Sequence, residues 1–301
     1  MMILVAAGLL AIAQSRDSLL DRIQARIAQD PGVQVGLAYV DLASGDTLYL
    51  NADTSFHAAS TMKVPVMIEL FRRANTGSFR MSQGLLLVNQ FASIADGSPY
   101  SLDLNSDSDS SLYHRVGERV HVDTLLRLMI TRSSNFATNA LITLVGAEAV
   151  TSTMRSLGAQ RIQVLRGVED GKAFEKGLNN TTTARDLSII LRAIEEGRAA
   201  PPAATREMLG ILLAQEFNEK IPAGLPAGTR VAHKTGEITA VSHDAAIIYP
   251  PGRKPYVLVV LTRGIPDGTK SSKLIADIST IVYAHSSAKA ARGTTSTRVA
   301  N

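Results

Sequence analysis

Three short polar motifs lie far apart in this chain and could together make a nucleophilic site. In chain order they are Ser60-x-x-Lys63, Ser133-Ser134-Asn135 and Lys234-Thr235-Gly236. A serine hydroxyl is a poor nucleophile until a neighbouring base accepts its proton. Ser60 and Lys63 are three residues apart, which is nearly one helical turn, so on a helix they face the same side. The sequence therefore predicts a serine nucleophile at Ser60 with Lys63 as its base.

The surroundings of Lys63 allow two interpretations of this lysine. It stands inside an apolar run, HAASTMKVPVMIEL, whose Pro65 is tolerated only near the start of a helix. The helix should therefore begin close to Ser60, with Lys63 in its first turn. Lys63 could extend along the surface and keep its ammonium in water. Alternatively, burial and a second cation such as Lys234 could lower its pKa and make it a proton acceptor.

The other motif residues suggest further steps of an acyl transfer. Backbone N–H groups at the helix start, and one just after Gly236, could bind the oxygen of an attacked carbonyl. Ser133 could deliver a proton to the leaving nitrogen. Asn135 could hold a substrate amide, and Lys234 with Thr235 could bind a substrate carboxylate.

Hydrophobic periodicity predicts an α+β fold with the cleft between two lobes. Helices are expected over 18–28, 122–130, 137–145, 183–196 and 270–283, and strands over 33–42, 47–50, 230–234, 245–249 and 256–262. Strands from both ends of the chain can then share one antiparallel sheet. We expect one catalytic domain over 18–285, with an α/β lobe (18–63 and 216–285) and a helical lobe (64–215). Thr181 or Thr182 could cap the helix that begins at 183. The Ser-, Asp- and Gly-rich segment 92–111 is predicted to be a surface insertion.

Composition excludes several other classes of protein. The net charge is only +4 and its basic residues are scattered, so no nucleic-acid surface is expected. There is no cysteine, and no two histidines form a zinc motif, so we expect no metal and no other cofactor. Residues 1–13 resemble a secretory h-region ending in an A-x-A site, although no Lys or Arg precedes it; a buried strand is the alternative. Residues 286–301 are expected to be disordered.

Taken together, the three motifs resemble those of the class A β-lactamase and penicillin-binding-protein superfamily of serine acyltransferases. The resemblance extends over about 18–285 and includes Thr181-Thr182-Thr183-Ala184 after the family's omega loop. It implies an α/β lobe beside a helical lobe, and a β-lactam or a peptidoglycan stem peptide as the small-molecule partner. It also implies a monomer that is periplasmic or secreted. The resemblance implies that Ser60 is the nucleophile, Lys63 the base and Ser133 the proton shuttle. The implied substrate-binding residues are Asn135, Lys234, Thr235 and Gly236.

Two departures from the family pattern concern the middle motif and the omega loop. Ser134 stands where class A enzymes usually carry Asp. Class A lactamases use an omega-loop Glu to activate the deacylating water, whereas Val168 takes that place here when the count starts at Arg166. Glu169, one residue late, could replace it; Glu175 precedes an L-N pair with the family's spacing and is a second candidate. Both could equally be solvated loop carboxylates.

Three functions are compatible with these motifs. The first is a serine β-lactamase that releases the product after acylation of Ser60. The second is a D-alanyl-D-alanine carboxypeptidase with slow deacylation, and the third is a β-lactam-binding module without turnover. Near the third motif, His233 and His243 could touch substrate, and Arg263 could contact a substrate carboxylate or form a salt bridge.

Overall fold

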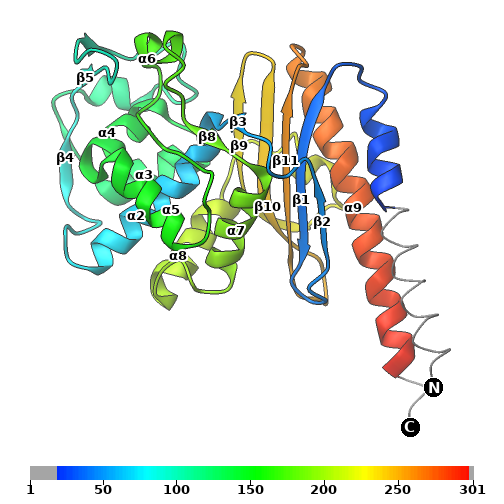
Figure 1. Ribbon diagram of the computed structural model, residues 1–301. Coiled ribbons are helices and arrows are strands. Elements are labelled where there is room, and N and C mark those ends of the chain that lie inside the picture. The colour runs from blue at the N-terminus through cyan, green and yellow to red at the C-terminus, as the bar shows by residue number, and fades with distance from the viewer. Residues whose placement is uncertain (1–18, 298–301) are drawn as a thin grey trace.

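A five-stranded antiparallel sheet joins the two ends of the chain in the computed structural model. The structure describes residues 19–297, with side chains described up to residue 288. Its strand order is β2-β1-β11-β10-β9, and Figure 1 shows the N-terminal hairpin beside the C-terminal strands. The bounds are β1 (Gln34–Asp41), β2 (Thr47–Leu50), β9 (Arg230–Ile238), β10 (Val241–Tyr249) and β11 (Tyr256–Arg263). The prediction that both ends share one sheet is confirmed, because β1 pairs with β11.

Alternate residues of the sheet face two separate cores. Leu37 and Tyr39 of β1 pack with the helix over residues 19–27 and with α9 (Gly268–Thr297). Ala38 and Val40 point the other way, into the core shared with the helical lobe. This alternation is the period of two expected for a strand covered on both faces. The sheet is thereby a rigid support between two helical layers (Figure 1).

The helical lobe is built around one central helix, α2 (Lys63–Asn75), whose residues from Lys63 to Phe71 are all buried. A helix that is buried on every side is typical of the centre of a large core. The helices around it and towards the sheet are α3 (Val122–Thr131), α4 (Asn135–Val145), α5 (Ala147–Ser156), α6 (Gly171–Glu175), α7 (Ala184–Glu195) and α8 (Pro202–Leu213). Short 3-10 turns are η1 (Ala59–Met62), η2 (Ser111–Arg115) and η3 (Pro222–Gly224).

Three small two-stranded sheets tie down the loops of this lobe. They are β3 (Phe56–His57) with β8 (Thr181–Thr182), β4 (Gly84–Leu86) with β7 (Arg119–His121), and β5 (Phe91–Ala92) with β6 (Pro99–Tyr100). The predicted insertion over 92–111 contains β6, and it is not only a surface feature. Ser93, Leu102 and Asp109 within it are buried.

Several predicted boundaries are wrong. Residues 286–297, predicted to be disordered, continue α9, in which the run from 288 to 292 (AKAAR) consists of good helix formers. Thr183, rather than Thr181 or Thr182, caps α7 by accepting a bond from the Asp186 amide (3.1 Å). The strand predicted to end at Lys234 runs on to Ile238. The predicted signal peptide over 1–13 and residues 298–301 lie outside the described residues. Within residues 19–297, no helix is both long and apolar enough to cross a membrane.

Candidate active site

Ser60 and Lys63 are held by the junction between η1 and α2. Ala59, at the start of η1, has a left-handed backbone (φ +45°), and its amide donates to Nδ1 of His57 (3.0 Å). Ser60 is partly exposed and lines the cleft, whereas Lys63 is fully buried. The interpretation of Lys63 as a surface lysine is therefore wrong. The apolar run around it encloses its ammonium within the protein.

Two ammonium groups converge on the hydroxyl of Ser133. Nζ of Lys63 lies 3.1 Å from Oγ of Ser133, and Nζ of Lys234 lies 3.0 Å from the same atom. Lys63 also donates to the Ser133 carbonyl (2.5 Å) and to Oδ1 of Asn135 (2.9 Å). A hydroxyl has two acceptor positions and one hydrogen. When both lysines are protonated they occupy both acceptor positions, and the hydrogen of Ser133 is then free to point at a substrate atom.

Burial changes the proton affinity of both lysines. It lowers the pKa of Lys63 to about 7, although the negative charges of Asp107 and Glu169 oppose this effect. Burial also lowers the pKa of Lys234 well below its ordinary value, and the charge of Lys63 lowers it further. Near neutral pH, a large fraction of Lys63 can therefore be an amine, which is the state that accepts a proton.

The third motif approaches Ser60 through Gly236. A methyl group added at Gly236 would lie 3.0 Å from the backbone nitrogens of Ser60 and Thr61, so any larger residue would crowd this contact. β9 is the edge strand of the five-stranded sheet, so one side of its backbone faces the cleft. The backbone of Gly236 therefore lies close to the Ser60 amide, which is the proximity that a shared oxyanion site requires.

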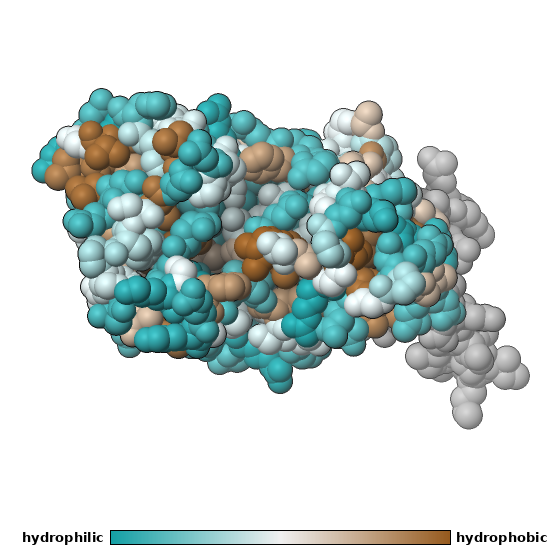
Figure 2. All heavy atoms as spheres, turned by 90° about the horizontal axis from the view of Figure 1, so that it is seen from above, coloured by the Kyte–Doolittle hydropathy of each residue, from teal (hydrophilic) through white to brown (hydrophobic). Residues whose placement is uncertain are grey.

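The cleft consists of two adjoining cavities that share Ser60. One, of about 360 Å³, is lined by residues that include His57, Phe174 and Ile238. The other, of about 290 Å³, is lined by residues that include Ser133 and Thr235. Seen from above, the surface is hollowed between the helical lobe and the sheet, with apolar atoms beside the hollow (Figure 2). A substrate bound at Ser60 can extend one arm into each cavity.

In the omega loop, Val168 is held by its backbone, whereas Glu169 directs its carboxylate to the cleft. Both backbone groups of Val168 are held by the Asn139 side chain, which accepts from its nitrogen (2.6 Å) and donates to its oxygen (3.0 Å). Glu169 has a left-handed backbone (φ +59°), and its carboxylate accepts a bond from Nδ2 of Asn135 (3.3 Å). It lines both cavities. Glu175 is exposed on α6 and lines neither of these cavities, so of the two candidates only Glu169 faces Ser60.

Ser133 also has a left-handed backbone (φ +58°), as do Ala59 and Glu169. Non-glycine residues pay a cost of about 1–3 kcal/mol in sparsely populated backbone regions, and such strain concentrates at functional sites. All three residues line the cleft: Ala59 and Glu169 line the larger cavity, and Ser133 and Glu169 line the smaller one. The surrounding packing therefore enforces the positions of these side chains.

Three other residues named in the sequence analysis lie away from the cleft. His233 is buried against Asp244 (Nδ1 to Oδ1, 3.0 Å). His243 is buried behind the site, with Nε2 2.9 Å from the His57 carbonyl. Arg263 donates to Oε1 of Gln34 (2.7 Å). We therefore assign structural contacts to all three.

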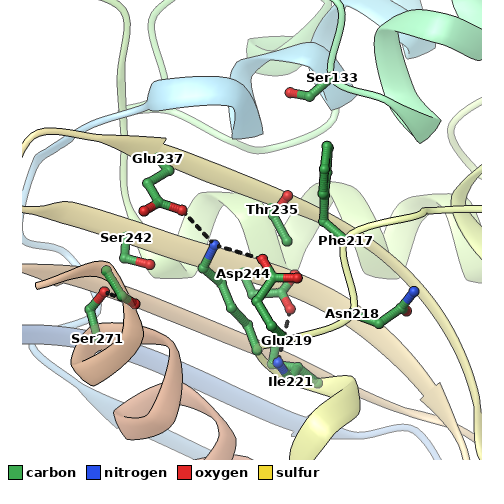
Figure 3. A network of polar contacts seen from close by, with 12 residues as sticks. Ser133, Phe217, Asn218, Glu219, Ile221, Thr235, Glu237, Ser242, Asp244 and Ser271 are labelled. Carbon is green, nitrogen blue, oxygen red and sulfur yellow. Dashed lines mark hydrogen bonds and ion pairs between the residues drawn. The ribbon is translucent and has the colours of Figure 1, made fainter. Parts of the chain in front are cut away.

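Lys220 was missed by the sequence analysis, because a lone lysine outside any motif gives no signal. Its side chain is 1% exposed and lines the smaller cavity. Its ammonium lies 3.0 Å from a carboxylate oxygen of Glu237 and 3.4 Å from one of Glu219 (Figure 3). Both carboxylates belong to half-exposed side chains at the rim. Lys220 therefore adds a buried positive charge beside Thr235, where an anionic group could bind.

Metal chemistry has no support among the side chains that the structure describes. No group of three or more acidic, histidine or cysteine side chains there could hold a metal ion. The arrangement instead contains the groups expected of a serine acyltransferase: the Ser60 hydroxyl at the cleft, the buried amine of Lys63, and the Ser133 hydroxyl bonded to it. Each of these belongs to one of the three motifs.

The chain belongs to the β-lactamase enzyme family, whose model matches residues 18–286. Among its curated relatives, β-lactamase AST-1 of Nocardia asteroides is 30% identical over 86% of this chain and 81% of its own length. A β-lactamase of Sphaerobacter thermophilus has a similar structure, with a TM-score of 0.76 and 29% identity over 88% of this chain and 95% of that one. A mutant of PBP-A, solved as an acyl-enzyme complex with penicillin G, gives a TM-score of 0.77 and 29% identity over 89% of this chain and 95% of that one. The predictions of a class A β-lactamase type of hydrolase and of its α+β fold are confirmed.

Proposed function

We propose that this protein is a serine β-lactamase that opens the lactam ring through an acyl-enzyme on Ser60. Family membership supports the activity. The observation that carries the assignment of residues is the convergence of Lys63 and Lys234 on Ser133 beside Ser60. This constellation provides a proton acceptor for the nucleophile and a proton donor for the leaving nitrogen.

Acylation uses the neutral amine of Lys63 as general base. It accepts the proton of Ser60 while Oγ attacks the lactam carbonyl, and the Ser60 amide with the edge of β9 stabilises the oxyanion. Ser133 then gives its proton to the ring nitrogen as the C–N bond breaks, and Lys63 or Lys234 returns a proton to Ser133. The hydrogen bonds that both ammonium groups already make to Oγ of Ser133 provide this path.

Deacylation requires a water molecule and a base on the opposite side of the ester. Val168 carries no ionisable group, so we assign this role to Glu169. Its carboxylate lines both cavities and is held by the amide of Asn135. Asn135 also accepts from Lys63, so one side chain links the acylation base and the deacylation carboxylate.

The two cavities suggest how substrate is oriented. The smaller cavity contains Thr235 and Lys220, with Lys234 buried behind them, and suits the carboxylate of a β-lactam. The larger cavity contains Phe174 and Ile238 and suits an apolar acyl side chain such as a benzyl group. Asn135 lines both cavities and can bind the acylamino group.

The test is turnover of benzylpenicillin and nitrocefin by purified wild type and by Ser60→Ala, with Ser55→Ala as the control. Ser55 is an exposed serine outside both cavities. We expect wild type and the control to hydrolyse both compounds, and Ser60→Ala to be inactive and unlabelled by penicillin in intact mass spectra. Equal rates in Ser60→Ala and wild type would refute the assignment of the nucleophile.

A second candidate function is a D-alanyl-D-alanine carboxypeptidase that acts on peptidoglycan stem peptides. The apolar Val168, held where Asn139 clamps the omega loop, favours this candidate. Intact mass after a single addition of penicillin separates the two functions. A mass increment that persists for many minutes favours the peptidase, and its loss within seconds favours the lactamase. Persistent labelling without turnover of any peptide or lactam would indicate a binding module.

We also propose that the chain is exported, in keeping with the apolar run over residues 1–13. Expression of the full chain in a bacterium, fractionation and N-terminal sequencing test this. A product in the exported fraction that begins after Ala13 supports export. An intact N-terminus on a protein retained in the cytoplasm contradicts it.

A further inference from the structure

The N-terminus of α4 receives a carboxylate from a distant loop. Asp107 lies in the segment between β6 and η2, and its two oxygens accept bonds from the backbone nitrogens of Asn135 (2.9 and 3.0 Å) and Phe136 (2.9 Å). The hydroxyl of Ser134 accepts the next one, from Ala137 (3.2 Å). The first three amides of α4 are therefore all satisfied, two of them by Asp107.

The same helix end presents the residues that act at the cleft. Asn135 is the first residue of α4, and its side chain contacts both Lys63 and Glu169 (2.9 and 3.3 Å). Ser133 precedes it in a left-handed conformation that its own sequence does not favour. A small rotation of this helix end would separate Asn135 and Ser133 from the Lys63 amine. The bonds from Asp107 oppose such a rotation.

The loop that carries Asp107 is itself anchored to the helical lobe. Ser108 donates to the Arg132 carbonyl at the end of α3 (2.7 Å), and the Tyr113 hydroxyl donates to Asp107 (3.0 Å). Ser106 and Ser108 line the smaller cavity. The loop is thus held at Asp107 itself and at the residue that follows it, and it brings a negative charge close to the active-site amine.

We propose that Asp107 is a positioning residue of the active site: it fixes Asn135 and Ser133 against Lys63 and supplies a carboxylate that the Ser133-Ser134-Asn135 motif lacks. Its charge favours the protonated form of Lys63, as the charge of Glu169 does. The Nζ atom of Lys234 faces the same group of atoms from β9, and its pKa is lowered by burial and by the charge of Lys63. Asp107 thereby balances the effect of burial, which alone would lower the proton affinity of Lys63 further.

The effect of Asp107 on acylation rests on the proposed function, whereas the titration that tests the inference does not. The Lys63 midpoint is measured by NMR titration of protein labelled with [ε-¹³C]lysine, without any substrate, and the signal is assigned by its absence in Lys63→Arg. In Asp107→Asn we expect the midpoint to fall by about 0.5–1.5 pH units, the effect of one charge several ångströms away. The matched control is Asp103→Asn. It removes the same charge from the same loop, where the carboxylate bonds Asn105 (both 3.0 Å).

The rescue variant is Asp107→Asn/Ser134→Asp, which returns a carboxylate to the same helix end. We expect the Lys63 midpoint and the rate of penicillin acylation to return towards wild type. An unchanged midpoint in Asp107→Asn, an equal shift in Asp103→Asn, or a double variant without recovery overturns the proposal. If Asp107→Asn does not fold, the Lys63 midpoint of Ser134→Asp is compared with that of the double variant. Equal Lys63 midpoints in these two proteins overturn the proposal. A wild type that penicillin never labels refutes the proposed function alone, because the titration needs no ligand.

Discussion

The proton-accepting state of Lys63 provides the sharpest quantitative prediction. With a pKa of about 7, roughly half of Lys63 is neutral at pH 7. With the ordinary lysine value of about 10.4, only about one molecule in 2,500 would be neutral. Burial thus increases the population of the base on the order of a thousandfold. In Lys63→Arg the guanidinium stays protonated at every accessible pH, so this base is lost.

We expect Lys63→Arg to slow acylation by about 10²–10⁴-fold, which is the usual contribution of a general base. The assay is single-turnover labelling with a fluorescent penicillin between pH 5 and 9. In wild type the rate should fall as pH decreases, with a midpoint near 7, because protonation removes the base. Lys172→Arg is the control, since Lys172 is exposed and bonds Asp96 and Ser98.

Two results would refute this reasoning. One is labelling of Lys63→Arg within about tenfold of wild type, since general-base catalysis contributes more than that. The other is a wild-type midpoint near pH 4–5, where carboxylates ordinarily titrate, which would show that Lys63 is not the acylation base.

Three further predictions concern other parts of the site. Glu169→Gln should slow deacylation by about 10²-fold or more, so that the acyl-enzyme accumulates in intact mass spectra, whereas Glu175→Gln, on the exposed face of α6, should match wild type. Gly236→Ala should reduce the acylation rate by about 10²-fold, because its methyl group would push β9 away from the Ser60 amide; unchanged labelling would contradict this contact. Burial lowers the pKa of His243 to about 4, whereas an unfolded chain takes up this proton near 6.5. Stability should therefore decline by about 3 kcal/mol from pH 6.5 to 4, and His243→Gln should show a smaller decline in urea titrations.

The sequence by itself determined the motifs and most of the elements that carry them. Pro65 restricts the start of α2, so Ser60, in the 3-10 turn η1, and Lys63, the first residue of α2, lie one turn apart by local geometry. Alternating apolar residues placed β1 and the C-terminal strands, because the period of two depends on each strand alone. The glycine of the third motif was also identified, although the reason for it, contact with the Ser60 amide, was not.

Only the tertiary structure decided the properties that depend on residues far apart in the chain. Burial of Lys63 and its nearness to Ser133 require α2, α4 and β9 to pack together, and no local pattern encodes their distances. The same holds for which loop carboxylate lies at the cleft: Glu169 lines both cavities, and Glu175 lines neither. Helix starts and strand periods arise from short-range sterics, whereas pKa values and hydrogen-bond partners arise from desolvation and charge in the assembled core.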